Sequence, residues 1–83
     1  MSISNEAVSA LIQAGFTDAQ VNVSGDGYKY HARVVSADFK GMTKIKRHQK
    51  VYATLSEAIA SGELHALTIE ALTPEEASKL EKK

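Results

Sequence analysis

The chain of 83 residues contains no cysteine. This absence excludes a disulfide-stabilised scaffold, a zinc site built on cysteine and a thiol nucleophile. It also means that this chain cannot hold an iron–sulfur cluster with thiolates of its own. Because nothing in the cysteine content points to an oxidising compartment, we expect the cytoplasm as the location.

Long hydrophobic runs, proline and an N-terminal positive charge are also scarce. No apolar stretch approaches the ~20 residues that a membrane-spanning helix needs, so no membrane role is expected. Residues 1–20 contain Glu6 and Asp18 but neither lysine nor arginine, which is unlike a signal peptide. With 43% hydrophobic residues, 24% charged residues and one proline, the composition is typical of a folded chain. No repeat or linker interrupts the sequence, which predicts a single domain over residues 1–83.

The net charge of zero hides an uneven distribution. Residues 29–50 hold seven basic side chains and one acidic side chain, whereas the segments on either side are acidic. Such a segment can be a solvated cationic face, or it can bind an acidic protein or the phosphates of a nucleic acid. The sequence leaves both interpretations open. The densest part of this segment contains Lys40, Lys44, Lys46, Arg47 and Lys50.

The first half of the chain predicts a helix followed by a β-hairpin. Ser4 is a suitable N-cap, Gly15 a suitable C-terminal stop, and an apolar stripe at helical spacing lies between them. Residues 21–23 then alternate as a short strand. Asp26-Gly27 indicates a tight turn, because both residue types tolerate unusual backbone angles. The return strand covers residues 28–36, with Lys29, His31 and Arg33 on its solvated face.

The second half predicts helix, strand and helix. The apolar spacing predicts a long helix over residues 43–60. Its predicted buried stripe consists of Ile45, His48, Tyr52, Leu55 and Ile59. Val51 and Ala58 widen this stripe. Residues 64–72 form a third strand that places His65, Leu67, Ile69 and Ala71 on its apolar face. Thr73-Pro74-Glu75-Glu76 is a capping box that starts a last helix, with Ala77 and Leu80 facing inward. We therefore predict an α+β fold of order αββαβα, with a three-stranded mixed sheet and helices on one face.

The three histidines have different predicted environments. His31 lies on the wet face of the hairpin, where a solvated side chain is expected. His48 shares the helical stripe, which favours a structural, half-buried ring hydrogen-bonded to the backbone. His65 opens the third strand, where it either packs against the core or leaves one ring nitrogen open to solvent or a metal. Both interpretations of His65 stay open from the residues alone.

Several chemistries find no support in the motifs. Gly25-Asp26-Gly27 is followed by a strand rather than a helix, which is the wrong context for a dinucleotide-binding loop, so Asp26 is interpreted as turn chemistry. Serines, histidines and aspartates show no spacing that favours a hydrolytic triad. No two glycines are three positions apart, so the GXXG loop of RNA-binding KH domains is absent. We expect no enzymatic activity.

Five short motifs together resemble the BolA family over essentially the whole chain. In order they are Val35-Ser36, Phe39-Lys40-Gly41, Arg47-His48-Gln49-Lys50-Val51-Tyr52, Leu64-His65-Ala66-Leu67 and Thr73-Pro74-Glu75-Glu76. The Val-Ser-Gly-Asp-Gly sequence at residues 23–27 is most similar to the acid-stress branch, the YrbA-type proteins of proteobacteria. The resemblance implies a class II KH-like fold. It also implies two roles, namely binding a monothiol glutaredoxin, with or without a bridged [2Fe–2S] cluster, and DNA-binding regulation of transcription.

The resemblance also implies site residues. The cluster ligand of the family lies in the His-Ala-Leu motif, which is His65 here. The family's second ligand is a cysteine or histidine in the hairpin loop, where this chain has Asp26 as the second candidate. Because the chain has no cysteine, the thiolates would come from the glutaredoxin and glutathione. We expect a non-enzymatic adaptor that is a monomer or weak homodimer alone, with DNA binding through Lys44, Lys46 and Arg47 as the alternative function.

Overall fold

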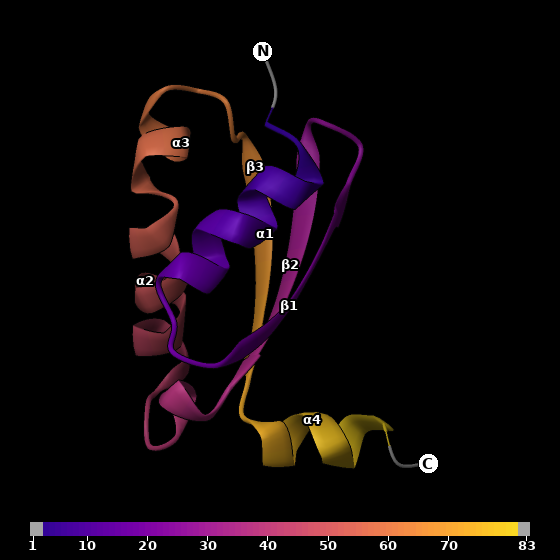
Figure 1. The fold of residues 1–83 in the computed structure, drawn as a ribbon, viewed down its shortest axis with the longest axis vertical. Helices are drawn as coiled ribbons and strands as arrows, with labels where there is room; N and C mark the ends of the chain where they lie inside the picture. The colour runs from indigo at the N-terminus through magenta and orange to yellow at the C-terminus, as the bar shows by residue number, and fades with distance from the viewer. Residues whose placement is uncertain (1–2, 82–83) are drawn as a thin grey trace.

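A computed structural model describes residues 3–81 of the protein. The elements confirm the predicted αββαβα order, except that the long middle helix is divided into two (Figure 1). In chain order they are α1 (Asn5–Ala14), β1 (Ala19–Gly25), β2 (Lys29–Ser36), the 3-10 turn η1 (Ala37–Phe39), α2 (Lys44–Thr54), α3 (Ser56–Ala60), β3 (Ala66–Leu72) and α4 (Pro74–Glu81).

The three strands form one mixed sheet in the order β1-β2-β3. β1 and β2 are antiparallel, whereas β2 and β3 are parallel, so the chain crosses over between them through α2 and α3. α1, α2 and α3 cover one face of the sheet, and α4 lies at its lower end (Figure 1). The opposite face of the sheet carries Lys29, His31 and Arg33, as predicted.

The core lies between the sheet and the helices that cover it. It combines Val8 and Ile12 of α1 and Val34 of β2 with Phe39 of η1, all fully buried. Ser4 caps α1 by accepting a hydrogen bond from the N–H of Ala7, which confirms the predicted helix start. No helix within residues 3–81 is both long and apolar enough to span a bilayer.

The predicted buried stripe of the middle helix is correct for Val51, Leu55 and Ala58 but wrong for its other apolar members. Val51, Leu55 and Ala58 are buried, whereas Ile45 is 72% exposed and Tyr52 and Ile59 are also exposed. Both sets of positions have helical spacing, so the sequence pattern did not distinguish them. The packing rotates the stripe that contains Ile45, Tyr52 and Ile59 outward.

The predicted single helix is interrupted at Leu55, whose φ of −116° and ψ of 9° leave the helical region. Thr54 donates its hydroxyl to the Val51 carbonyl at 2.6 Å, a local bond that competes with the helical ladder and bends helices. At the C-terminal end, Ala77 is buried as predicted, but Leu80 is exposed because α4 leaves the sheet there.

Candidate functional site

His65 lies directly before β3, and its side chain is exposed. Its ring stacks on the ring of Tyr28, with 5.3 Å between the centroids and 27° between the planes. Within the described part of the chain this is the one contact of the imidazole, so both ring nitrogens are without a hydrogen-bond partner there. The prediction that His65 lies on the apolar face of the third strand is therefore wrong, because the ring stacks on Tyr28 at the surface instead of packing in the core.

The backbone around His65 is tied to the hairpin turn. The N–H of Ala66 donates to the Tyr28 carbonyl at 3.2 Å, which brings the residue before β3 next to residues 26–28. Tyr30 donates its hydroxyl to the Ile3 carbonyl at 2.5 Å, and the N–H of Ile3 donates to the Glu63 carbonyl at 3.2 Å. An exposed ring is thus presented from a fixed backbone.

Asp26 builds the turn that lies beside His65. One carboxylate oxygen, Oδ1, accepts the N–H groups of Tyr28 and Lys29, each at 2.9 Å. The N–H of Lys29, followed by that of Tyr28, lowers the pKa of Asp26 below its ordinary value. This confirms turn chemistry for Asp26. Residues 3–81 contain no group of three or more His, Cys, Asp or Glu side chains that could hold a metal.

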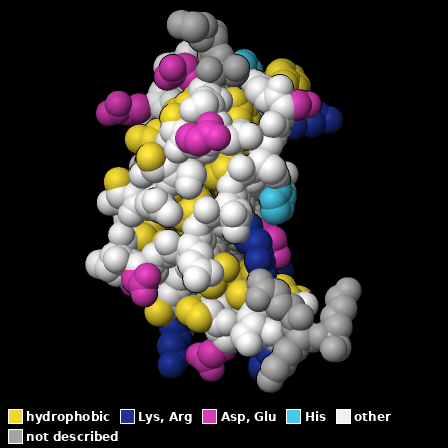
Figure 2. Space-filling view, turned by 45° about the vertical axis from the view of Figure 1, so that its right-hand side comes forward, with side chains coloured by type: hydrophobic (Ala, Val, Ile, Leu, Met, Phe, Trp, Pro, Cys, Tyr) yellow, Lys and Arg dark blue, Asp and Glu magenta, His cyan; other side chains and the backbone are white. Residues whose placement is uncertain are grey.

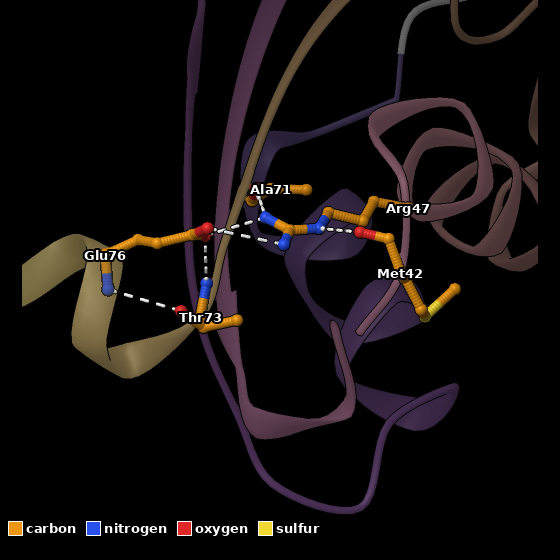
Figure 3. Close-up of polar contacts among 5 residues, drawn as sticks. All are labelled: Met42, Arg47, Ala71, Thr73 and Glu76. Carbon is orange, nitrogen blue, oxygen red and sulfur yellow. Dashed lines mark hydrogen bonds and ion pairs between the residues drawn. The ribbon is translucent and has the colours of Figure 1, made fainter. Parts of the chain in front are cut away.

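Arg47 is not a free recognition charge, in contrast to the prediction. Its side chain is only 13% exposed and lies between α2, β3 and α4 (Figure 3). Nε donates to the Met42 carbonyl at 3.0 Å, and Nη1 donates to the Ala71 carbonyl at 3.1 Å and to Oε1 of Glu76 at 2.7 Å. The planar guanidinium, which has several donors in fixed directions, joins three elements that are distant in sequence.

Glu76 forms the other half of this contact. Its Oε1 also accepts the N–H of Thr73 at 2.9 Å, and Oγ1 of Thr73 accepts the N–H of Glu76 at 3.2 Å. The predicted capping box is thereby confirmed. The hydrogen bond from Arg47, followed by that from Thr73, lowers the pKa of Glu76 to about 2.

The remaining basic residues fall into two groups. Lys40, Lys44 and Lys46 are exposed near the start of α2. Lys50 is half-buried, and its Nζ lies 5.2 Å from the centroid of the Phe16 ring, in a cation–π contact. Of the five predicted recognition charges, three are therefore exposed to solvent.

Comparison with known proteins shows which family the chain belongs to. The family model described as BolA-like protein matches residues 6–76. The chain belongs to the BolA-like family. The acid stress protein IbaG of Escherichia coli K12 is 36% identical over 72 residues, which cover 87% of this chain and 86% of IbaG. A protein from the rpoN-murA intergenic region of Acinetobacter guillouiae is 45% identical over 74 residues, 89% of each chain.

Other relatives extend the comparison. The DNA-binding transcriptional regulator BolA of Haemophilus influenzae is 38% identical over 61 residues, which cover 71% of this chain and 58% of that protein. The structure of a bolA protein homologue from Coxiella burnetii superposes with a TM-score of 0.82 at 30% identity, and covers 92% of this chain and 97% of that one. These likenesses confirm the predicted family and fold.

Two other histidines of this BolA-like chain differ from the predictions in detail. His48 is half-buried as expected, but its ring makes no hydrogen bond to the backbone of residues 3–81. Instead it lines a groove between α2 and β3. His31 lies on the open sheet face, where its Nε2 is 3.9 Å from Oε1 of Glu70, and Nε of Arg33 is 3.7 Å from the same oxygen.

This group on the open face was missed in the sequence. Glu70 is distant in sequence from the hairpin, and only the parallel register Arg33↔Glu70 shows that it belongs there. Figure 2 shows histidine, acidic and basic side chains along the right-hand side of the molecule. Alternation in the last strand predicts that Glu70 lies on the face opposite Leu67 and Ile69, but it does not show which partners Glu70 meets.

Proposed function

We propose that this BolA-like protein is a non-enzymatic adaptor that binds a monothiol glutaredoxin and shares a bridged [2Fe–2S] cluster with it. The observation that carries the proposal is the exposed His65 ring, which stacks on Tyr28 and has no hydrogen bond to either nitrogen within residues 3–81. A free imidazole nitrogen is an accepted iron–sulfur ligand. The names of its relatives as a stress protein and a regulator agree with a role without catalysis.

The side chains of this protein can supply one ligand to such a cluster. His65 supplies an imidazole, and the glutaredoxin cysteine and glutathione would supply thiolates. Asp26 is a poor second donor, because Oδ1 is already the acceptor of two backbone N–H groups. When bound, the cluster supplies iron that the partners can hold together and pass on. In this proposal, the chain's own residues position the imidazole and expose it to the partner.

Tyr28 has a defined part in this positioning. It is 61% exposed, so it belongs to the surface that a partner would contact rather than to the core. Its ring restricts the orientation of the neighbouring imidazole. The short turn at Asp26 in turn holds Tyr28, because the N–H of Tyr28 donates to the Asp26 carboxylate. The turn thus affects the orientation of the His65 ring through the stacking contact between Tyr28 and His65.

The decisive experiment mixes the protein with a cluster-loaded monothiol glutaredoxin under anaerobic conditions. We expect a heterodimer whose visible absorption and circular dichroism differ from those of the loaded glutaredoxin. The change should be lost with His65→Ala and kept with His31→Ala, which removes another exposed histidine. A His65→Ala heterodimer with the wild-type spectrum would overturn the ligand assignment.

DNA-binding regulation is the second candidate, supported by the name of the Haemophilus relative and by the exposed Lys40, Lys44 and Lys46. If all three lysines met phosphates, log K should fall with log salt at a slope of about −2.7. We expect the triple variant in which these lysines are replaced by alanine to lose retardation of a DNA fragment at low salt. No retardation by the wild-type protein would end this proposal.

A further inference from the structure

β3 is an edge strand whose outer side meets no other strand within residues 3–81. The N–H of Ala66 donates to the carbonyl of Tyr28, the residue before β2, so Ala66, Thr68 and Glu70 direct their backbone groups toward β2. Leu67, Ile69 and Ala71 alternate with these and direct theirs to the free edge. An edge of this kind is a template for another strand.

A groove runs along this free edge. It has a volume of about 370 Å³, and its walls are formed by Lys44, Arg47 and His48 of α2 and by residues 69–72 of β3. Arg47 closes part of the edge, because its Nη1 donates to the Ala71 carbonyl. Within residues 3–81, the outward backbone groups of Ile69, which lines the groove, and of Leu67, which precedes it on the same edge, have no hydrogen-bond partner. The exposed apolar residues of α2 and α3 that were predicted to be buried are Ile45, Tyr52 and Ile59.

The charges around the groove favour one kind of occupant. α2 carries four basic residues and no acidic one, and Lys44 lines the groove with an exposed ammonium group. A second copy paired along the same edge would bring two such helices together, and like charges at an interface are unfavourable.

A phosphate backbone fits less well than a protein segment. The guanidinium of Arg47 is already bound by Glu76, so it is withdrawn from phosphate. Glu70 also lines the groove and adds a negative charge. This charge opposes the continuous row of charges on a phosphate backbone, whereas a polypeptide can place its acidic residues at Lys44 and neutral residues beside Glu70. The open donors and acceptors of Leu67 and Ile69 match the spacing of an extended polypeptide.

The other edge of the sheet offers an internal comparison. β1 is also unpaired on its outer side within the described chain. The groove beside it is lined mainly by polar side chains and Glu6 of α1, without a basic residue. The two edges therefore differ in charge and in apolar surface, although both are unpaired with another strand within residues 3–81.

We propose that the groove between α2 and the free edge of β3 binds an extended acidic segment of a protein partner, which adds a fourth strand to the sheet. Acidic side chains of the segment meet Lys44, and its backbone pairs with the outward backbone groups of Leu67 and Ile69. This surface does not include His65 and does not depend on cluster binding.

Amide hydrogen exchange monitored by NMR tests the backbone part of the proposal. The probe is a blocked nine-residue peptide that alternates valine and threonine and carries aspartates at both ends. At saturation we expect the amides of Leu67 and Ile69 to exchange about tenfold more slowly. The amides of Val21 and Val23 on the β1 edge should not change. Protection of both edges alike, or of neither, would overturn the assignment.

Charge exchange tests the recognition part. We expect Lys44→Glu to weaken binding of the aspartate peptide about threefold, as for one partly exposed ion pair. A peptide with lysines in place of aspartates should show the reverse preference. Lys46→Glu is the matched control, because Lys46 lies on the same helix but not in the groove. Equal effects of the two variants would contradict a specific contact.

Two competing occupants have separate readouts. A DNA duplex that protects the same amides more tightly than the peptide would assign the groove to nucleic acid and overturn the proposal. A wild-type dimer in sedimentation, with Leu67 and Ile69 protected without peptide, would assign it to a second copy. His65→Ala should bind the peptide normally, so failure here is distinct from failure of cluster sharing.

Discussion

His65, Tyr28 and Asp26 show how single residues prepare the proposed ligand. Asp26 accepts two backbone N–H groups and orders the turn, and Tyr28 of that turn contacts the His65 ring. Because the carboxylate serves the turn, its role does not depend on iron. The two candidate ligands of the sequence therefore have different functions in the structure.

Asp26→Asn separates these functions. An asparagine carbonyl oxygen can accept the same two N–H groups, so we expect the turn and the cluster-bridged complex with glutaredoxin to be retained. The visible circular dichroism of the complex checks this, with Asp26→Ala as the variant that removes the acceptor. A complex lost with asparagine but formed normally with alanine would contradict the turn role.

Arg47→Met removes donors while keeping much of the side-chain volume. The Met42 and Ala71 carbonyls lose their side-chain donor, and we expect the free energy of unfolding to fall by about 1–3 kcal/mol. Chemical denaturation provides the measurement. Lys46→Met on the same helix is the control, and it should change stability by less than about 0.5 kcal/mol. Equal stability of the two variants would show that Arg47 is only a surface charge.

At the scale of elements, α2 and α3 show how packing selects one face of a helix. Leu55 is fully buried and Ile45 is 72% exposed, although the sequence places both in the same stripe. The inward position of Arg47 follows from contacts with distant segments, whereas the interruption at Leu55 coincides with the local hydrogen bond from Thr54 to Val51. Ile45, Tyr52 and Ile59 are left on the surface of these helices.

Alanine substitutions at these two positions test the rotation of the helix. We expect Leu55→Ala to lower the free energy of unfolding by about 2–5 kcal/mol, because it creates a cavity in the core. Ile45→Ala should change it by less than about 0.5 kcal/mol. Urea denaturation of both variants provides the measurement. The predicted stripe, in which both residues are buried, requires a large loss of unfolding free energy for each variant, whereas the structure requires it for Leu55→Ala alone.

For the molecule as a whole, α4 is fastened to the remainder of the fold by few contacts. Arg47 of α2 binds Glu76 of α4 and the last part of β3, and Ala77 packs against the core end of the sheet. The capping box at Thr73 sets where α4 begins. An ion pair at this junction links global stability to pH.

The pH dependence has a definite sign. The pKa of Glu76 is lowered from its ordinary value of 4.5 to about 2 by the hydrogen bond from Arg47, so its stabilising contribution is complete above about pH 4.5. It should be lost progressively as the pH falls through 4.5 toward 2. We expect the Tm difference between wild type and Glu76→Gln to shrink over this range in thermal melts. A difference that stays constant from pH 7 to pH 2.5 would contradict the ion pair.

The sequence by itself determined the order of elements, the hairpin turn, the helix starts at Ser4 and Thr73, and the wet face of β2. These features depend on neighbouring residues, whose preferences and hydrogen bonds act locally. It also carried the motifs by which the family was predicted. The charges of the basic segment were visible, but their environments were not.

Only the tertiary structure decided which helix stripe is buried, that Arg47 is bound internally and that His65 is exposed. Each of these depends on contacts between segments far apart in the chain, such as Arg47 with Glu76 and His65 with Tyr28. Two stripes with the same period are equivalent until a sheet packs against one of them. The free edge of β3 likewise exists only because the strands assemble in this order.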